Sequence, residues 1–141
     1  MRILLPLSAL AALFGFQAVF AFAGEAEIRA AQATIRAQLE AFRAGDNERA
    51  YSYAAPSIKR MFPTLERFMG MVTGSYQPVY RPRDYAFGAA REPNGTTVMQ
   101  RVLTTGTDGK NYEALYTLER QADGTYRITG VSLRETAGLS I

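Results

Sequence analysis

The last third of the chain, from Val79 to Glu135, constrains the fold more than any other stretch. Three turn signals, Pro93-Asn94-Gly95, Asp108-Gly109 and Asp123-Gly124, separate runs that are rich in Val, Thr, Tyr, Leu and Ile. Asn-Gly and Asp-Gly favour the type I′ turns of tight hairpins, because these turns need positive φ at both central residues. The stretch therefore predicts four strands that form an antiparallel meander.

The turn at Asp108-Gly109 predicts the register of the two central strands. A two-residue turn at this position pairs Arg101 with Tyr116. Because side chains alternate along a strand, Leu103 lies on the same face as these two residues. This face is mostly apolar, so we expect it to meet the helices, and Glu113 then points to the opposite face.

The last strand changes parity at Gly130. Tyr126 and Ile128 share one face of a regular strand, whereas Val131 and Leu133 share the other face. A β-bulge at or next to Gly130 would keep all four apolar side chains on the buried side. We therefore predict a bulge at this position.

The first strand is less well defined by the sequence. Pro78 and Pro82 cannot donate to a ladder, so this strand is expected at an edge or is expected to begin near Asp84. Turns of two and of three residues at Asn94-Gly95 place Phe87 on opposite faces, and both alternatives stay open.

Three helices are predicted before the meander. The first is amphipathic and runs from about Ala26 to Gly45, and the others cover about Asn47 to Ala54 and Leu65 to Thr73. Asp46 and Thr64 are suitable N-caps for the second and third helices. Large apolar side chains in this region either pack against the sheet or line a cavity. They are Tyr51, Tyr53, Met61, Phe62, Phe68 and Met71. One more helical turn between residues 57 and 62 is an open alternative.

Composition excludes several classes of site. The chain of 141 residues contains no Cys, His or Trp, which rules out disulfides, thiolate nucleophiles and His-dependent catalysis or metal binding. Its 16 basic and 13 acidic residues are interleaved without a basic run, so we predict no nucleic-acid partner. No catalytic residue, metal ligand or cofactor is predicted.

Residues 1–23 have the pattern of a signal peptide. An apolar run from Ile3 to Phe22 ends in Ala21-Phe22-Ala23, which matches the A-x-A cleavage pattern. We predict cleavage after Ala23, which leaves residues 24–141 as a single α+β domain in a bacterial periplasm or in the medium. The run is longer than a usual signal core, so an uncleaved membrane anchor is the alternative.

Arg101 is the polar exception on the predicted apolar face. A buried guanidinium needs a partner, because an unpaired buried charge is very costly. Its side chain either extends to water where the sheet opens, pairs with a carboxylate such as Asp84 or a helix acid, or lies at the floor of a pocket and binds an anionic ligand. The pocket alternative gives four candidate ligand-binding residues: Arg101, Tyr116, Tyr53 and Phe68.

Several stretches resemble a family of exported alphaproteobacterial proteins, the domain-of-unknown-function family numbered 4864. The resemblance spans Ile28 to Leu133 and includes residues 41–43, 54–58, 68–72, 76–82, 100–102, 114–120 and 123–128. Members often carry a Trp where this chain has Tyr126. The order of elements also resembles the nuclear transport factor 2-like superfold, which includes snoaL-like polyketide cyclases and ketosteroid isomerases. The resemblance implies three N-terminal helices packed on a curled four-stranded antiparallel meander, a cone, and it implies no established site.

Two function classes follow. The first is a non-catalytic periplasmic module that binds a small ligand or a protein partner, and the second is a small cone-fold enzyme of lyase or isomerase type that uses carboxylate and tyrosine. Proton transfer in such a cavity needs an Asp or His base, and Glu113 is expected to point outward. Binding is therefore the favoured interpretation. A homodimer is an open alternative, and a membrane contact is expected only if the signal segment stays uncleaved.

Overall fold

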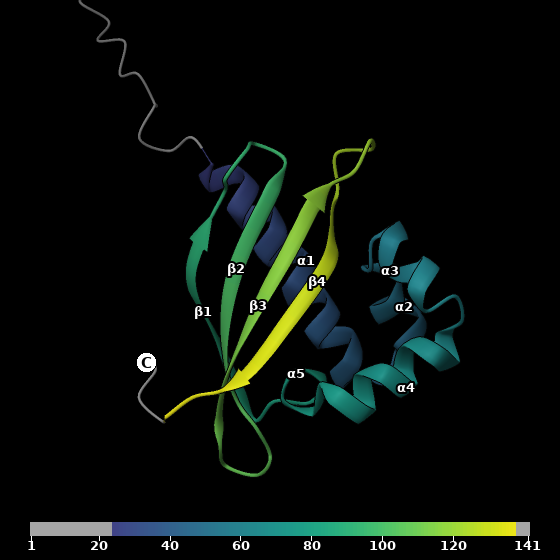
Figure 1. The fold of residues 1–141 in the computed structure, drawn as a ribbon, viewed down its shortest axis with the longest axis vertical. Helices are drawn as coiled ribbons and strands as arrows, with labels where there is room; N and C mark the ends of the chain where they lie inside the picture. The colour runs from purple at the N-terminus through teal and green to yellow at the C-terminus, as the bar shows by residue number, and fades with distance from the viewer. Residues whose placement is uncertain (1–23, 138–141) are drawn as a thin grey trace, which may run out of the picture.

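A computed structural model describes residues 24–137, in which helices cover one face of a four-stranded antiparallel sheet (Figure 1). The helices are α1 Glu25–Arg43, α2 Asn47–Ser52, α3 Pro56–Met61, α4 Leu65–Ser75 and α5 Gln77–Tyr80. The strands are β1 Asp84–Arg91, β2 Thr97–Thr105, β3 Asn111–Arg120 and β4 Tyr126–Glu135. They lie in the order β1-β2-β3-β4, so the predicted α+β class and the antiparallel meander are confirmed.

The predicted signal peptide and its cleavage after Ala23 lie outside the described residues. Between residues 24 and 137, no helix has the length and hydropathy needed to cross a membrane.

The described part of the chain has five helices, so the prediction of three is wrong. The additional helices, α3 and α5, are short, and each carries a proline in its first turn. Proline is tolerated there because that position has no intrahelical partner for an N–H group. The predicted N-caps are confirmed, since the side chains of Asp46 and Thr64 accept from the N–H groups of Arg49 and Arg67.

The predicted register of β2 and β3 is wrong by one residue. Arg101 pairs with Leu115, and Tyr116 pairs with Gln100. Because side chains alternate, this shift moves Arg101 to the face of the sheet that is turned away from the helices, together with Glu113. The inner face of β2 instead carries Gln100, which is fully buried.

The turn between β2 and β3 explains the difference. The N–H of Gly106 donates to the carbonyl of Lys110, and the N–H of Gly109 donates to the carbonyl of Gly106. Three residues, 107–109, therefore connect the paired ends, and Gly109 has a φ of 78°. A three-residue loop with glycine in the left-handed region is the next most common hairpin connection after the type I′ turn.

The first hairpin places Phe87 on the inner face, opposite Val102, and β1 departs from a regular ladder between Phe87 and Ala90. The side chain of Gln100 on β2 contacts this irregular part of β1 from the inner side of the sheet. Its side-chain Nε2 donates to the carbonyl of Gly88 at 3.0 Å.

The predicted bulge in β4 is confirmed. Thr117 pairs with Gly130 and Leu118 pairs with Ile128, which leaves Thr129 as the extra residue. Ile128 and Val131 therefore both face inward, and β4 bends at this point.

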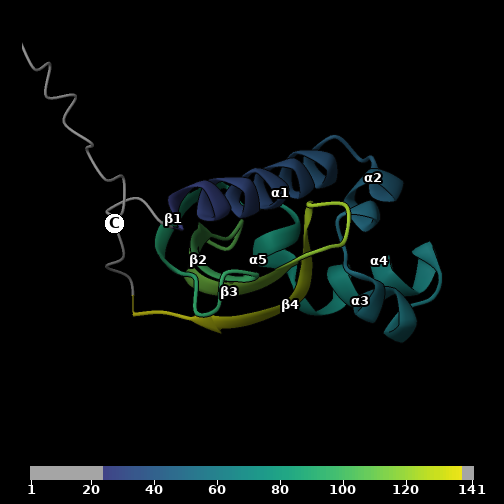
Figure 2. The ribbon, with the colours of Figure 1, turned by 90° about the horizontal axis from the view of Figure 1, so that it is seen from above.

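Two apolar clusters fill the space between the layers. The first lies between α1 and the curled sheet and includes Ile35, Val102 and Tyr116. The second lies among the helices and includes Phe42 and Phe68. Figure 2 shows α1 along one face of the sheet, with α2, α3 and α4 gathered next to β4.

Candidate functional site

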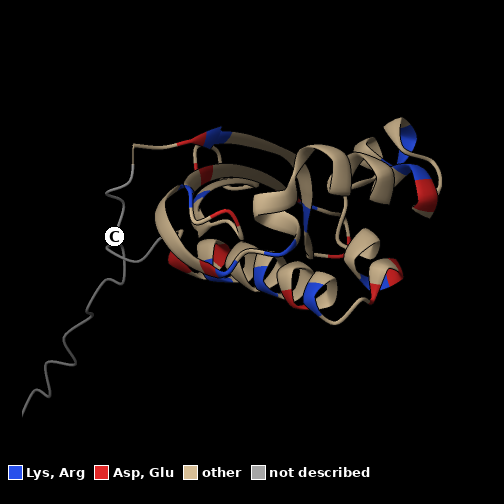
Figure 3. Ribbon diagram, turned by 90° about the horizontal axis from the view of Figure 1, so that it is seen from below, with Lys and Arg blue, Asp and Glu red and all other residues tan. Residues whose placement is uncertain are grey.

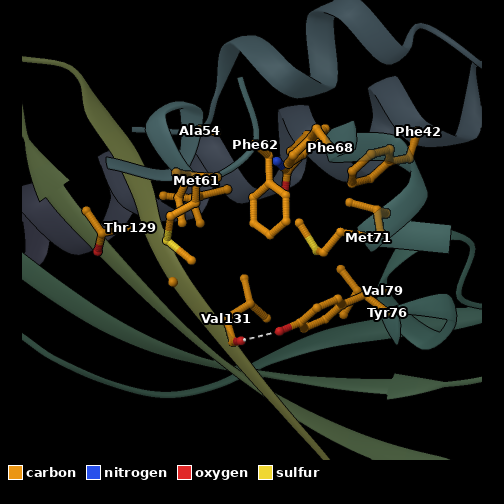
Figure 4. A pocket seen from close by; sticks show the side chains of 15 residues that line it. Phe42, Ala54, Met61, Phe62, Phe68, Met71, Tyr76, Val79, Thr129 and Val131 are labelled. Carbon is orange, nitrogen blue, oxygen red and sulfur yellow. Dashed lines mark hydrogen bonds between the residues drawn. The ribbon is translucent and has the colours of Figure 1, made fainter. Parts of the chain in front are cut away.

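A cavity of about 300 Å³ lies between β4 and the helices (Figure 4). Its walls come from α1, the α2–α3 connection, α3, α4, α5 and the bulged part of β4. They are formed by Gln38, Phe42, Ala54, Ile58, Met61, Phe62, Phe68, Met71, Val72, Tyr76, Val79, Ile128, Thr129, Gly130 and Val131. Among these described residues none is charged, so the wall is apolar with three polar side chains.

The hydrogen-bond donors of those three polar side chains are directed at backbone carbonyls. Gln38 Nε2 donates to Ala50 at 3.1 Å, and the Tyr76 hydroxyl donates to Val131 at 3.1 Å. Thr129 Oγ1 likewise donates to the carbonyl of Thr117 on β3 at 3.1 Å. With these donors engaged, the cavity presents mainly hydrocarbon and thioether groups to a ligand.

The bulge in β4 opens the sheet edge towards the cavity. The carbonyl of Ile128 accepts from the N–H of Ala55 at 2.8 Å, and the carbonyl of Val131 accepts from the Tyr76 hydroxyl. These contacts cover the strand edge on both sides of Thr129 and Gly130, which themselves line the cavity. The bulge therefore places a threonine and a glycine, both small, between the two covered positions.

Helix α3 forms the rim of the cavity. Met61 on this helix is 66% exposed, and none of the helix residues is buried. The Tyr51 hydroxyl holds the end of the helix by donating to the carbonyl of Phe62. Helix α3 is therefore only partly buried, whereas Phe68 on α4 is buried.

Phe68 lines the cavity and is held by neighbouring rings. Its ring centroid lies 4.8 Å from that of Tyr51 and 6.4 Å from that of Phe42. Aromatic pairs at these centroid distances are stabilising beyond the area that they bury. Of the four candidate ligand-binding residues, Phe68 is the one that the structure places at this cavity.

Tyr53 and Tyr116 lie outside the cavity wall. The Tyr53 hydroxyl accepts from Arg49 Nε at 3.1 Å, and the carbonyl of Tyr53 accepts from the N–H of Ile128 at 2.9 Å. Tyr116 is fully buried in the sheet cluster, its hydroxyl has no hydrogen-bond partner among the described residues, and burial raises its pKa. Both residues have packing roles here.

The predicted shared face of Arg101 and Tyr116 is wrong, and Arg101 does not line the cavity between β4 and the helices. Its side chain pairs with Glu113 on the outer face of the sheet. Of the three alternatives, pairing with a carboxylate is observed, with Glu113 as the partner instead of Asp84 or a helix acid, and the Arg101 side chain is also 47% exposed. Binding of an anionic ligand by Arg101 stays a prediction.

The β4 segment from Thr129 to Val131 is one part of the cavity wall that the sequence analysis did not predict. The signal that could have identified it is the parity change at Gly130, because a bulge at a strand edge opens a gap in the backbone ladder. Tyr76 was also missed, since its role depends on a hydrogen bond to a residue far along the chain.

Comparison with known proteins identifies one family and one solved structure. The family model described as Domain of unknown function (DUF4864) matches residues 23–141. A 2.5 Å structure of a protein from Catenulispora acidiphila is similar with a TM-score of 0.50 and 18% identity, covering 79% of this chain and 94% of that chain. No curated protein matches the chain. At this level of identity the solved structure supports the fold alone.

Proposed function

This chain belongs to the family described as Domain of unknown function (DUF4864), and we propose that it is a non-catalytic module that binds a small apolar ligand in the cavity between β4 and the helices. The observation that supports this function most is the uncharged wall of the cavity. A volume of about 300 Å³ is at the lower end of the range for ligand pockets, and about twice that of an engineered apolar cavity that binds benzene. The proposed ligand is therefore a compact ring system or a short hydrocarbon chain.

The methionines in the wall suit such a ligand. Met61 and Met71 both line the cavity, one at the rim and one on α4. Methionine has a flexible, polarizable side chain that adapts to apolar ligands of different shapes. This supports binding of a class of molecules in preference to one highly specific compound.

The enzyme alternative has less support from the cavity. General acid–base catalysis needs a titratable group within hydrogen-bond reach of the substrate. Among the described wall residues there is no carboxylate, and the phenol of Tyr76 donates to a backbone carbonyl. The binding function is preferred for this reason.

Titration with the neutral fluorescent probe N-phenylnaphthylamine tests the function. Val131→Phe fills the cavity, because Val131 lines it and faces inward, and we expect the probe to bind at least about tenfold more weakly. Leu103→Phe is the control, since it also introduces a phenyl ring but on the outer face of the sheet, away from the cavity. Equal binding to the unsubstituted protein and to both variants would refute the cavity as the binding site.

We further propose that the protein acts in the periplasm or the medium after cleavage behind Ala23, and that its fold is the nuclear transport factor 2-like cone. The apolar run followed by Ala21-Phe22-Ala23 supports export. Helices packed on one face of a curled meander support the cone (Figure 2). Intact-mass measurement of the exported protein tests cleavage, and a mass that still includes residues 1–23 would refute it. Native mass spectrometry of the same sample would show a retained ligand.

A further inference from the structure

A second hollow lies on the outer face of the sheet, on the side away from the helices. It has a volume of about 380 Å³ and is lined by Arg101, Glu113, Leu115, Ser132 and Arg134. The register places Arg101, Leu115 and Ser132 in one row across β2, β3 and β4, and it places Glu113 beside Arg134 in the next row. The hollow is thus formed by rigid strands, with Leu115 between the polar groups.

The charges in this hollow do not balance. Glu113 accepts from Arg101 Nη1 on one side and from Arg134 Nη2, at 3.1 Å, on the other. Two guanidinium groups and one carboxylate give 2 − 1 = +1. Among the described residues, a further ion pair joins Lys110, in the turn between β2 and β3, to Glu135 on β4, and its two charges cancel. One positive charge is therefore left without a counter-charge in the hollow.

The two arginines keep donors for a ligand. A guanidinium has five N–H donors in a planar fork, and each arginine donates one hydrogen bond to Glu113. The Arg101 and Arg134 side chains are 47% and 68% exposed, whereas the Glu113 side chain is 13% exposed. The carboxylate is covered and the guanidinium groups remain accessible. Glu113 is therefore a positioning residue that holds both forks over the hollow.

We propose that this hollow binds the carboxylate of a small organic acid. The carboxylate lies between the guanidinium groups of Arg101 and Arg134 and accepts from the Ser132 hydroxyl, while an apolar part of the acid covers Leu115. A single negative charge brings the hollow to neutrality, whereas a phosphate dianion would leave an excess negative charge next to Glu113. Arginine forks also match the two oxygens of a carboxylate in geometry. This site is separate from the apolar cavity and does not depend on it.

Titration with benzoate, followed by amide chemical shifts of protein purified from cells that express the full chain, tests the site. We expect saturable shifts at the amides of Leu115 and Ser132, and much smaller shifts with neutral benzamide. Arg101→Gln and Arg134→Gln are each expected to weaken benzoate binding about tenfold or more, because each removes charged hydrogen bonds. Circular dichroism and thermal unfolding confirm that the variants are folded.

Two control variants make the result specific. Lys110→Gln removes one positive charge from an exposed ion pair at the turn between β2 and β3, and Val131→Phe blocks the apolar cavity. Both are expected to leave benzoate binding unchanged. Equal weakening by Lys110→Gln would show a general charge effect, and loss of binding in Val131→Phe would place benzoate in the cavity. Either result would overturn the proposal, as would equal binding of benzamide or the absence of saturation.

Discussion

The side-chain amide of Gln32 on α1 donates a hydrogen bond to Oε1 of Gln100 on β2, with 2.9 Å between the two atoms. Gln100 is fully buried, and its own Nε2 donates to the carbonyl of Gly88, where β1 leaves the regular ladder. One side chain therefore connects the long helix to the irregular part of the edge strand. Buried polar groups of this kind are stabilising only while all partners are present.

Gln100→Met keeps the side-chain volume and removes these hydrogen bonds. We expect a loss of about 1–3 kcal/mol in the free energy of unfolding, because the partners of Gln100 stay buried without it. Denaturant unfolding of Gln32→Met, Gln100→Met and the double variant measures the coupling between the two residues. Gln121→Met, beside the turn between β3 and β4, is the control and should change stability by less than about 0.5 kcal/mol, because its side chain makes one solvent-exposed hydrogen bond to the carbonyl of Glu119. Additive effects of the two glutamine variants would contradict a direct link.

Two tyrosines with different hydrogen bonding give a second prediction. The Tyr116 hydroxyl is buried and has no partner among residues 24–137, whereas the Tyr76 hydroxyl donates to the carbonyl of Val131. We expect Tyr116→Phe to leave stability unchanged or to raise it, since it removes a desolvated polar group. Tyr76→Phe should lower stability by about 1 kcal/mol. Thermal unfolding of both variants checks the expectation, and a larger loss for Tyr116→Phe would contradict it.

Two single-residue deletions in β4 test the register of this strand. Thr129 is the extra residue of the bulge, so its deletion joins Ile128 to Gly130 in a regular ladder and leaves every later side chain on its present face. Deletion of Ser132 instead moves Leu133 outward and Arg134 inward. We expect the second deletion to destabilise the fold far more than the first. Urea unfolding measures both, and equal losses would argue against the register shown here.

Deletion of Thr129 should also change the cavity, because Thr129 and Gly130 line it. The variant is expected to remain folded and to bind N-phenylnaphthylamine more weakly. Unchanged probe binding in a folded variant would show that the bend in β4 does not shape the cavity.

The turn between β2 and β3 gives a prediction about pH. The Tyr112 hydroxyl donates to Asp108 Oδ2 at 2.6 Å, and this hydrogen bond lowers the pKa of Asp108 and raises the pKa of Tyr112 to about 12. The contribution of Asp108 to stability is therefore complete above its ordinary pKa of 3.8 and is lost as pH falls through the lower folded value. The contribution of Tyr112 is complete below its ordinary pKa of 10.0 and is lost as pH rises towards about 12.

Asp108→Asn is expected to make the free energy of unfolding fall less steeply with decreasing pH. It should also lower the pKa of Tyr112 towards its ordinary value. Unfolding at a series of acidic pH values and near-ultraviolet absorbance in alkali measure the two effects. Asp123→Asn is the matched control, because Asp123 accepts from Thr125 instead of a tyrosine hydroxyl. It should leave the titration of Tyr112 unchanged, and an equal effect of both variants on Tyr112 would contradict the assignment.

Charge is distributed without a dominant sign over the ribbon, with basic and acidic residues interleaved along helices and strands (Figure 3). The sequence predicted this mixture, because its 16 basic and 13 acidic residues are interleaved without a basic run. It did not predict the local excess of positive charge at Arg101, Glu113 and Arg134, which come together only across three paired strands. Long-range pairing is therefore what creates the second hollow.

The sequence by itself determined the features that depend on neighbouring residues. Helix caps at Asp46 and Thr64, the order of the four strands and the bulge beside Gly130 each follow from local backbone preferences and side-chain alternation. Tertiary structure decided which face Arg101 occupies. The Asp108-Gly109 pair is compatible with loops of two or three residues, and a difference of one residue in the loop moves every side chain of the strand to the opposite face. Tertiary structure also decided the cavity, whose walls come from helices and a strand edge that are distant in sequence and meet only when both apolar clusters pack.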